Sequence, residues 1–367
     1  MHAVINCRSI LKKTHSGIGR YTFQLVHALA GLDQQNKYSL YCPQGFFDFK
    51  RQVPDAPGSN FRIRRDYFKQ GPERVCGSHD LYHSPSPDDL FKVKGNGKLI
   101  VTVHDLIYKT YPQGHTKETI ALTDRFIRQA LEKAHKIICV SQSTQEDLRK
   151  FFNLSADRSC VIYHGVDHQT FYPQDDKRPG WLMEAGITKP FILFVGTLEP
   201  RKNLAGLLKS FALLKSSRKF NGQLVITGMK GWMNESIPPL IKSLEMGQDI
   251  VFMGFVSDQQ LRDLYNRTEV FVFPSFYEGF GFPILEAFCC AAPVITSNTS
   301  SCKEIAGNAA VLTDPGNPES IAQAIARVLD DESLRAKLRR EGLSRCQEFS
   351  FLKTAQETLN IYQEVAG

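Results

Sequence analysis

The sequence has no uninterrupted apolar run long enough for a membrane span and no paired-cysteine motif. Its most apolar stretch, residues 270–297, is broken by three prolines and two glutamates, at Pro274, Glu278, Pro283, Glu286 and Pro293. A spanning helix would not easily tolerate these residues. The first residues enter a strand pattern with no basic and apolar leader before them, so we expect no secretory signal. Nine cysteines without a C-x-x-C pair favour a reducing cytoplasm.

The composition also lacks the bias of a disordered or fibrous chain. With 42% hydrophobic and 23% charged residues, it is typical of a folded globular protein. A length of 367 residues is too great for one ordinary core and fits two α/β domains. The net charge of +7 suits anionic small molecules or an anionic membrane surface, but it is too mild to indicate nucleic acid.

Short β-branched or aromatic runs alternate with helix-period segments along the chain, which predicts an α/β fold with largely parallel sheets. In the first half, we expect strands at residues 3–6, 38–42, 99–103, 137–140 and 160–163, and helices at 20–30, 117–134 and 144–152. The pattern restarts after the polar stretch 172–179, with strands at 191–195, 224–227, 250–253, 270–273, 294–296 and 309–312. We therefore predict domains at residues 1–173 and 174–351, with a terminal helix at 352–367 that packs back on the first domain.

Two polar motifs lie at expected strand ends in the first half. Gly17 and Gly19 stand where the first strand turns into a helix, so backbone amides and the helix dipole there could approach a phosphate or a sugar. A tight turn without a ligand is the alternative, and the missing third glycine argues against a dinucleotide fingerprint. His104 and Asp105 follow the strand at 99–103, at the edge where open α/β sheets bind ligands. A histidine hydrogen-bonded inside a loop is the alternative here.

Adjacent cations mark the start of the second half. Arg201 and Lys202 follow Thr197 and precede a helix expected from about Leu204. They could clamp a diphosphate and stabilise the negative charge that develops as it leaves. A solvated surface pair is the alternative. Cations in a first helical turn oppose the helix dipole, however, so a bound anion explains them better.

The most specific motif runs from Glu278 to Glu286. Glu278 begins a glycine turn with the sequence Glu-Gly-Phe-Gly-Phe, and Glu286 lies in the helix that Pro283 begins. A carboxylate can accept two hydrogen bonds from vicinal sugar hydroxyls, and the amides of residues 279–282 can meet a hydroxyl or a phosphate. Two glutamates alone would be weak evidence, but the glycines and the proline make the pattern specific.

Together and in this order, the four motifs resemble family-4 retaining glycosyltransferases. The resemblance implies the GT-B fold, an α/β fold in which two Rossmann-like domains face each other across a cleft. It places Arg201 and Lys202 on the donor diphosphate, Glu286 on the ribose, and Glu278 with the amides after it on the donor sugar. The implied catalytic residues are His104, Glu278, Arg201 and Lys202. The implied donor-binding residues are Gly17, Gly19, Thr197, Arg201, Lys202, Glu278, Gly279, Phe280, Gly281, Phe282 and Glu286.

The runs at residues 17–22 and 195–204 look most like the mannosyltransferases of bacterial surface-polysaccharide assembly. The resemblance implies transfer of a hexose with retention at the anomeric carbon, with mannose from GDP-mannose favoured, to a saccharide or lipid-linked saccharide acceptor. A glucosyl- or rhamnosyltransferase that uses a UDP- or dTDP-sugar is an open alternative. So are a nucleotide-sugar epimerase or hydrolase on the same scaffold and a non-catalytic sugar-binding protein. Ala291 stands where the family commonly has glycine, a change that affects packing more than chemistry.

No metal ion or other cofactor is expected at this site. The chain has no Asp-x-Asp triplet, the usual carboxylate pair that holds a divalent ion against a diphosphate. Arg201, Lys202 and helix dipoles must therefore meet that charge. The four-residue spacings His79/His83 and His164/His168 are interpreted as coincidence, because proline and glycine beside them argue against a helix.

Residues 61–69 interleave cations with aromatic side chains. This stretch could rest on an anionic membrane or bind a phosphorylated acceptor, although a solvated edge strand is the favoured interpretation. The expected partners are thus a nucleotide-sugar donor and a saccharide or lipid-linked acceptor, without nucleic acid. The expected location is cytoplasmic, and peripheral contact with the inner face of an anionic membrane is left open.

Overall fold

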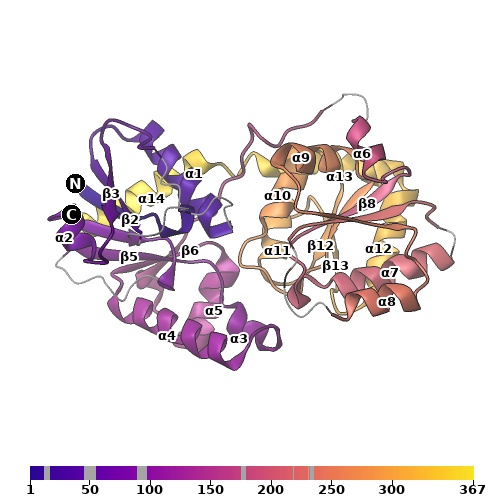
Figure 1. The fold of residues 1–367 in the computed structure, drawn as a ribbon, viewed down its shortest axis with the longest axis horizontal. Coiled ribbons are helices and arrows are strands. Elements are labelled where there is room, and N and C mark those ends of the chain that lie inside the picture. Colours follow the sequence, from indigo (N-terminus) through magenta and orange to yellow (C-terminus); the bar gives the residue numbers. More distant parts are fainter. Residues whose placement is uncertain are drawn as a thin grey trace. The chain divides into compact units, whose positions relative to one another are not determined.

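The chain folds into two compact units (Figure 1). The computed structural model describes residues 1–11, 17–44, 55–88, 97–174, 179–217, 219–229, 231 and 235–367. The first unit comprises Met1–Lys109, His115–Gly165 and Ser350–Gly367, and the second comprises Thr110–Gly114 and Val166–Phe349. The long segment of the second unit begins at Val166, whereas we predicted the domain boundary between residues 173 and 174.

Seven parallel strands form the sheet of the first unit, in the order β3-β2-β1-β4-β5-β6-β7. They are β1 (His2–Asn6), β2 (Lys37–Pro43), β3 (Phe61–Asp66), β4 (Leu81–Ser84), β5 (Lys98–Val103), β6 (Lys136–Cys139) and β7 (Ser159–Val161). β4 was not among the predicted strands, because its sequence Leu-Tyr-His-Ser is short and half polar. β3 belongs to the basic and aromatic stretch and lies at the edge of the sheet, as the edge-strand interpretation predicts.

Two apolar clusters pack helices against this sheet. α1 (Gly17–Leu32) and α14 (Phe351–Ala366) contact each other over one cluster, which includes Leu25 and Leu359. The other cluster includes Ile127 of α4 (Lys117–Lys133) and Leu148 of α5 (Gln142–Phe152). The short elements of this part of the chain are α2 (Pro72–Cys76), α3 (Ile107–Thr110) and 3₁₀ turns at Arg8–Ile10, Pro112–Gly114 and Ala156–Arg158.

The start of α14 packs directly against Gly165. A Cβ atom built on Gly165 would lie 2.1 Å from the backbone nitrogen of Phe351, closer than real atoms approach. The Thr354 hydroxyl on α14 donates to the carbonyl of Tyr163 at 2.8 Å. The Tyr362 hydroxyl lies 2.6 Å from Nδ1 of the buried His83. The terminal helix is therefore an integral part of the first unit.

Six parallel strands form the sheet of the second unit, in the order β10-β9-β8-β11-β12-β13. They are β8 (Phe191–Val195), β9 (Gln223–Thr227), β10 (Ile250–Gly254), β11 (Val270–Phe273), β12 (Val294–Ser297) and β13 (Val311–Thr313). All six predicted strands of this half are present, although the last begins at Val311 and not at residue 309.

Eight α-helices of the described residues belong to the second unit. They are α6 (Gly180–Glu184), α7 (Leu204–Ser216), α8 (Ile237–Ser243), α9 (Asp258–Arg267), α10 (Phe282–Cys289), α11 (Ser300–Ala306), α12 (Pro318–Asp330) and α13 (Glu332–Cys346). Apolar side chains of α7 and α12, such as Phe211 and Ile325, share one core cluster with strands β8, β9 and β11. Within the described ranges, no helix combines the length and the apolar character needed to cross a membrane.

Both sheets have the doubly wound strand order. In each, the chain starts at a central strand, winds out to one edge and returns to the other side, so that β1 lies between β2 and β4, and β8 lies between β9 and β11. Open α/β sheets bind ligands outside the carboxyl ends of their strands at this switch point. We therefore expect ligand-binding residues directly after β1, β4 and β5 in the first unit and after β8 and β11 in the second.

Candidate active site

The switch point of the second unit holds a cluster of four charged side chains. Arg201 and Lys202 follow β8 in a 3₁₀ turn, and Glu278 follows β11. The Nη1 atom of Arg201 lies 2.7 Å from Glu278 Oε2, and the Nζ atom of Lys202 lies 2.6 Å from Glu278 Oε1. Arg201 Nη2 also lies 2.5 Å from Oε1 of Glu199. One carboxylate thus bridges the two cations that the sequence predicts as an anion clamp.

Burial and charge set the protonation of this cluster. Glu278 and Lys202 are only 7% and 8% exposed. Burial raises the pKa of the Glu278 carboxyl group, but the charges of Arg201 and Lys202 outweigh it and lower this pKa to about 2. Burial also lowers the pKa of Lys202, and the Glu278 carboxylate opposes that change. The two glutamates balance the two cations, so the cluster as a whole is neutral.

Asn203 fixes the turn that carries the cations. Its side chain caps α7 by accepting a hydrogen bond from the Gly206 N–H at 3.2 Å. The same side chain donates to the carbonyls of Pro274 and Pro315 at 3.1 and 2.6 Å. Its backbone has a φ of 57°, in the left-handed region that asparagine adopts more readily than most residues. Asn203 therefore ties the loop after β8 to the loop after β11.

Two serines at the start of α11 hold the backbone of Glu278. The Glu278 N–H donates to Ser300 Oγ at 3.1 Å, and Ser301 Oγ donates to the Glu278 carbonyl at 2.9 Å. Gly281 then leads into α10 with a φ of 110°, which strains any residue with a side chain. The second glycine of the motif is thus required by the turn that places Glu278 and starts the helix.

Glu286 lies on α10, about one turn after the start of that helix at Phe282. It is 4% exposed, and the Tyr265 hydroxyl donates to its Oε2 at 3.2 Å. The Phe280 side chain is buried and packs edge-on against Phe282, with ring centroids 5.3 Å apart. The side chain of Phe280 is therefore engaged in packing, and only its backbone is suited to a polar ligand.

The loops after β8 and β9 approach each other at their backbones. The Leu198 N–H donates to the Met229 carbonyl at 3.0 Å. A Cβ atom on Gly228 would lie 2.0 Å from the Gly196 carbonyl oxygen, so only glycine fits there. Thr197, a predicted donor-binding residue, lies half-buried in this pair of loops.

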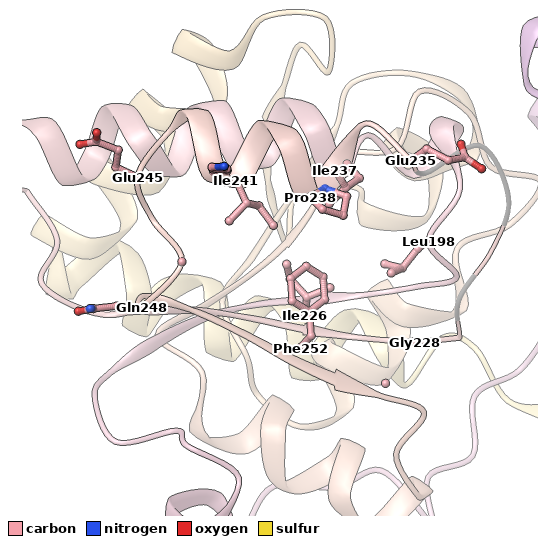
Figure 2. Close-up of a pocket in the computed structure, with 13 residues that line it drawn as sticks. Leu198, Ile226, Gly228, Glu235, Ile237, Pro238, Ile241, Glu245, Gln248 and Phe252 are labelled. Atoms are coloured by element: carbon pink, nitrogen blue, oxygen red, sulfur yellow. The ribbon is translucent and has the colours of Figure 1, made fainter.

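An apolar cavity of about 970 Å³ lies beside these loops, lined by residues of α8, β9 and β10 (Figure 2). Ile237 and Ile241 of α8 point toward Ile226 and Phe252 of the two strands, and Leu198 lies at one end. Walls of this kind suit a planar or aliphatic group and offer little to a diphosphate. The charged cluster, and not this cavity, is therefore the candidate for phosphate binding.

His104 lies at the switch point of the first unit, directly after β5. Its Nε2 lies 2.8 Å from the carbonyl oxygen of Pro85, which follows β4. Because a carbonyl oxygen only accepts, Nε2 carries the proton, and in a neutral ring Nδ1 is then an acceptor. Burial lowers the pKa of His104 and outweighs the opposing effect of the Pro85 hydrogen bond. The ring is therefore neutral at neutral pH.

Two more rings pack around His104. Tyr21 on α1 and His164 each have ring centroids 5.3 Å from that of His104. Gly19 is buried in the same turn of α1 as Tyr21, and Gly17 is the first residue of the helix. Within the first unit, the glycine turn and His104 are thus neighbours. His15 and Ser16, which also belong to the predicted glycine motif, lie outside the described residues.

The structure joins Arg201, Lys202 and Glu278 in direct contact. The remaining donor-binding predictions of the second unit, Thr197, Gly279, Phe280, Gly281, Phe282 and Glu286, lie on the loops and the helix that adjoin these three residues. Sequence reasoning did not assign roles to Glu199, Asn203, Tyr21 or His164. Of these, Glu199 is an acidic residue two positions before Arg201, and Asn203 stands at the N-cap position of the helix expected from about Leu204.

Comparisons with known proteins identify the family of this chain. The family model described as Glycosyltransferase Family 4 matches residues 15–170, and the model described as Glycosyl transferases group 1 matches residues 184–345. The chain is a glycosyltransferase. It belongs to the family that these two models describe, and it resembles polysaccharide mannosyltransferases. The O-antigen chain mannosyltransferase B of Escherichia coli is 29% identical over 374 residues, covering 96% of this chain and 97% of that protein.

Solved glycosyltransferase structures have the same fold as this glycosyltransferase. Sucrose-phosphate synthase from Thermosynechococcus elongatus matches with a TM-score of 0.79 and 22% identity, covering 99% of this chain and 98% of the other. HepE of Anabaena, solved in complex with UDP and glucose, matches with a TM-score of 0.74 and 16% identity, covering 99% of this chain and 100% of the other. The predicted GT-B fold with two Rossmann-like domains is confirmed. The family match also favours a transferase over the epimerase, hydrolase and sugar-binding alternatives.

Proposed function

We propose that this glycosyltransferase is a retaining mannosyltransferase that moves mannose from GDP-mannose to a saccharide or lipid-linked saccharide in cell-surface polysaccharide synthesis. The observation that carries the proposal is the buried Arg201, Lys202 and Glu278 cluster at the switch point of the second unit. The choice of mannose is supported by the similarity to the O-antigen chain mannosyltransferase B over nearly the whole of both chains.

In this proposal, Arg201 and Lys202 bind the donor diphosphate. A guanidinium has five N–H donors and an ammonium has three, so each cation can hold Glu278 and a phosphate oxygen together. The carboxylate keeps the buried Lys202 and the partly buried Arg201 in place before the donor arrives. As the bond to the sugar breaks, negative charge grows on the phosphate, and cations that are already oriented stabilise it without reorganisation.

Two further side chains recognise the donor in this scheme. Glu286 accepts hydrogen bonds from the ribose hydroxyls, since an ionised carboxylate acts only as an acceptor. His104 presents Nδ1 as an acceptor to a hydroxyl of the donor sugar, because the Pro85 carbonyl fixes the proton on Nε2. Both roles follow the family resemblance and agree with the hydrogen-bonding capacity of the two side chains.

The transfer itself forms one bond and breaks another on the same face of the sugar. The acceptor hydroxyl oxygen bonds to the anomeric carbon as the bond from that carbon to the phosphate oxygen breaks. The departing phosphate takes the hydroxyl proton. Because the new bond forms on the face that the phosphate leaves, the configuration at the anomeric carbon is retained. No metal ion takes part in this scheme, because Arg201 and Lys202 meet the phosphate charge.

The proposal is tested by incubating the protein with GDP-mannose, UDP-glucose or dTDP-rhamnose in EDTA, with and without short mannose oligosaccharides as acceptors. We expect release of GDP from GDP-mannose that depends on acceptor, and an α-linked product by NMR. Lys202→Met should abolish release, whereas the matched variant Lys215→Met, at the far end of α7, should retain it. Turnover of a different donor would reject the mannosyl assignment, and free or epimerised sugar made without acceptor would reject transfer.

A further inference from the structure

We infer that His168, Cys289 and Cys346 form a binding site for a soft divalent metal ion such as Zn²⁺, separate from the donor site. Among the described residues, this is the one group of three metal-binding side chains, with its ligand atoms all within 4.8 Å of one another. Cys289 Sγ lies 3.5 Å from His168 Nδ1. Tetrahedral zinc, with bonds of about 2.3 Å to sulfur and about 2.0–2.1 Å to nitrogen, separates these atoms by about 3.5 Å. The pair therefore already has the spacing that zinc requires.

Hydrogen bonds from neighbouring residues hold two of the three ligand residues, His168 and Cys346. His168 Nε2 lies 3.1 Å from the Phe349 carbonyl oxygen, so Nε2 carries the proton and the lone pair of Nδ1 faces Cys289. Gln347 Nε2 donates to Cys346 Sγ at 3.8 Å. Outer contacts of this kind fix the tautomer and direction of metal ligands.

Close packing of two helices brings the thiols together. A Cβ atom on Gly342 of α13 would lie 2.7 Å from Cδ1 of Phe288 on α10, so glycine permits an approach that other residues would prevent. Cys289 is the next residue on α10, and Cys346 lies one turn beyond Gly342 on α13. Both thiols therefore lie near this close approach of the two helices.

Charge balance favours a divalent ion at this buried position. Cys289 and Cys346 are 2% and 0% exposed, so a net charge here would be costly. Binding forms two metal–sulfur bonds as two S–H bonds lose their protons to solvent, and two thiolates then neutralise the ion. His168 is the partly exposed member of the group and marks the side where the ion and a fourth ligand from water can enter.

The site ties together three parts of the second unit. The Phe349 carbonyl accepts both the Val166 N–H, at 3.4 Å, and His168 Nε2, at 3.1 Å. Val166 and Phe349 are the first and last residues of the long segment of this unit. Cys289 lies one turn after Glu286 on α10. A bound ion would therefore fix α10 to the two ends of this long segment and so stabilise the unit.

The test uses the full chain, stripped of metal and kept reduced without oxygen. Titration with Cd²⁺ should give a thiolate-to-metal absorption band that saturates at about one ion per chain, with release of about two protons. Zn²⁺ should displace Cd²⁺ and raise the thermal unfolding midpoint. Cys346→Ser and His168→Gln should each weaken Zn²⁺ binding by at least about 10-fold, measured against a chromophoric chelator.

The matched control is Cys42→Ser, which removes a buried thiol of the first unit and should leave Zn²⁺ affinity unchanged. Because His168 is partly exposed, His168→Gln is the variant least prone to misfolding, and circular dichroism checks each protein. The proposal is overturned if the reduced wild-type chain binds no stoichiometric Cd²⁺ or Zn²⁺. It is equally overturned if Cys42→Ser loses as much affinity as Cys346→Ser.

Discussion

Lys202 Nζ and Glu278 Oε1 lie 2.6 Å apart, and both residues are buried. A second cation, Arg201, holds the other oxygen of the same carboxylate. Removing one partner of such a pair leaves an uncompensated buried charge, whereas the intact pair is roughly neutral for stability. We therefore expect that a substitution of one of these donor-binding residues also lowers the stability of the second unit.

A double-mutant cycle on Lys202 and Glu278 measures this coupling. We expect Lys202→Met and Glu278→Gln each to lower the free energy of unfolding by about 3 kcal/mol, because each leaves a buried charge. The double variant should lose about 1–3 kcal/mol less than the sum of the two. Urea unfolding followed by circular dichroism gives the four values.

The control cycle is the pair Lys337 and Glu341 on α13, which is more exposed than the buried pair and whose charged atoms lie 3.8 Å apart. Exposed pairs at this helical spacing contribute about 0.3–0.5 kcal/mol. If the Lys202 and Glu278 effects also add within about 0.5 kcal/mol, the two residues do not form the buried pair described above.

Acid should destabilise the first unit well before it affects Glu278. Burial lowers the pKa of His83 to about 3, so the unfolded chain binds a proton between about pH 6.5 and pH 3 that the folded chain does not. Stability then falls by about 1.4 kcal/mol per pH unit for this histidine as pH drops below about 6.5. The stabilisation from Glu278, whose folded pKa is about 2, is lost only as pH falls below about 4.5.

Between pH 6.5 and pH 4.5, the loss of stability should thus come from protonation of histidines and not from Glu278. The slope of the unfolding free energy against pH is proportional to the number of protons taken up on unfolding. We expect His83→Gln to reduce this number by about one, measured by urea unfolding at several pH values. His27→Gln, at an exposed histidine of α1, is the matched control for loss of a histidine. An unchanged slope in His83→Gln would contradict the assignment of a buried neutral imidazole hydrogen-bonded to Tyr362 and Thr102.

Replacing two glycines of the first unit by alanine should change the stability of the protein in opposite directions. Gly165→Ala places a methyl group against the Phe351 backbone, so α14 must shift, and we expect a loss of at least about 3 kcal/mol. Gly31 is an exposed residue of α1 with nothing within 4 Å of an added Cβ. Gly31→Ala should therefore stabilise the helix by about 0.5–1 kcal/mol. Thermal unfolding of both variants checks the pair, and equal effects would refute the close packing at Gly165.

The strands of the second unit were predictable because each is a short buried run of apolar residues. Segments such as Phe191–Val195 and Val270–Phe273 are buried on both faces, so their sequence has few polar interruptions. β4 escaped prediction because its His83 is polar. That histidine is accommodated by hydrogen bonds to Tyr362 and Thr102, residues that lie far away in sequence.

The motifs of the candidate site were found, but their interactions were not. Arg201 follows β8 and Glu278 follows β11, so strands β9, β10 and β11 lie between them along the chain. Only the sheet topology, in which β8 and β11 are neighbours, brings the two side chains into contact. The sequence therefore suggested two unpaired cations and a separate sugar-binding carboxylate, whereas the structure gives one neutral cluster. The same limit applies to His168, whose cysteine partners come from α10 and α13.

The central claim is that the switch point of the second unit binds a nucleotide-sugar donor without metal. It is tested most directly by calorimetric titration of GDP-mannose, in EDTA, into the wild-type protein, Glu286→Ala and the control Glu319→Ala, an exposed glutamate on α12. We predict that wild type and Glu319→Ala bind alike and that Glu286→Ala binds at least about 10-fold more weakly, since ionic hydrogen bonds contribute about 1.5–3 kcal/mol. Equal affinity in all three proteins would contradict the assignment of Glu286 and, with it, the proposed donor site.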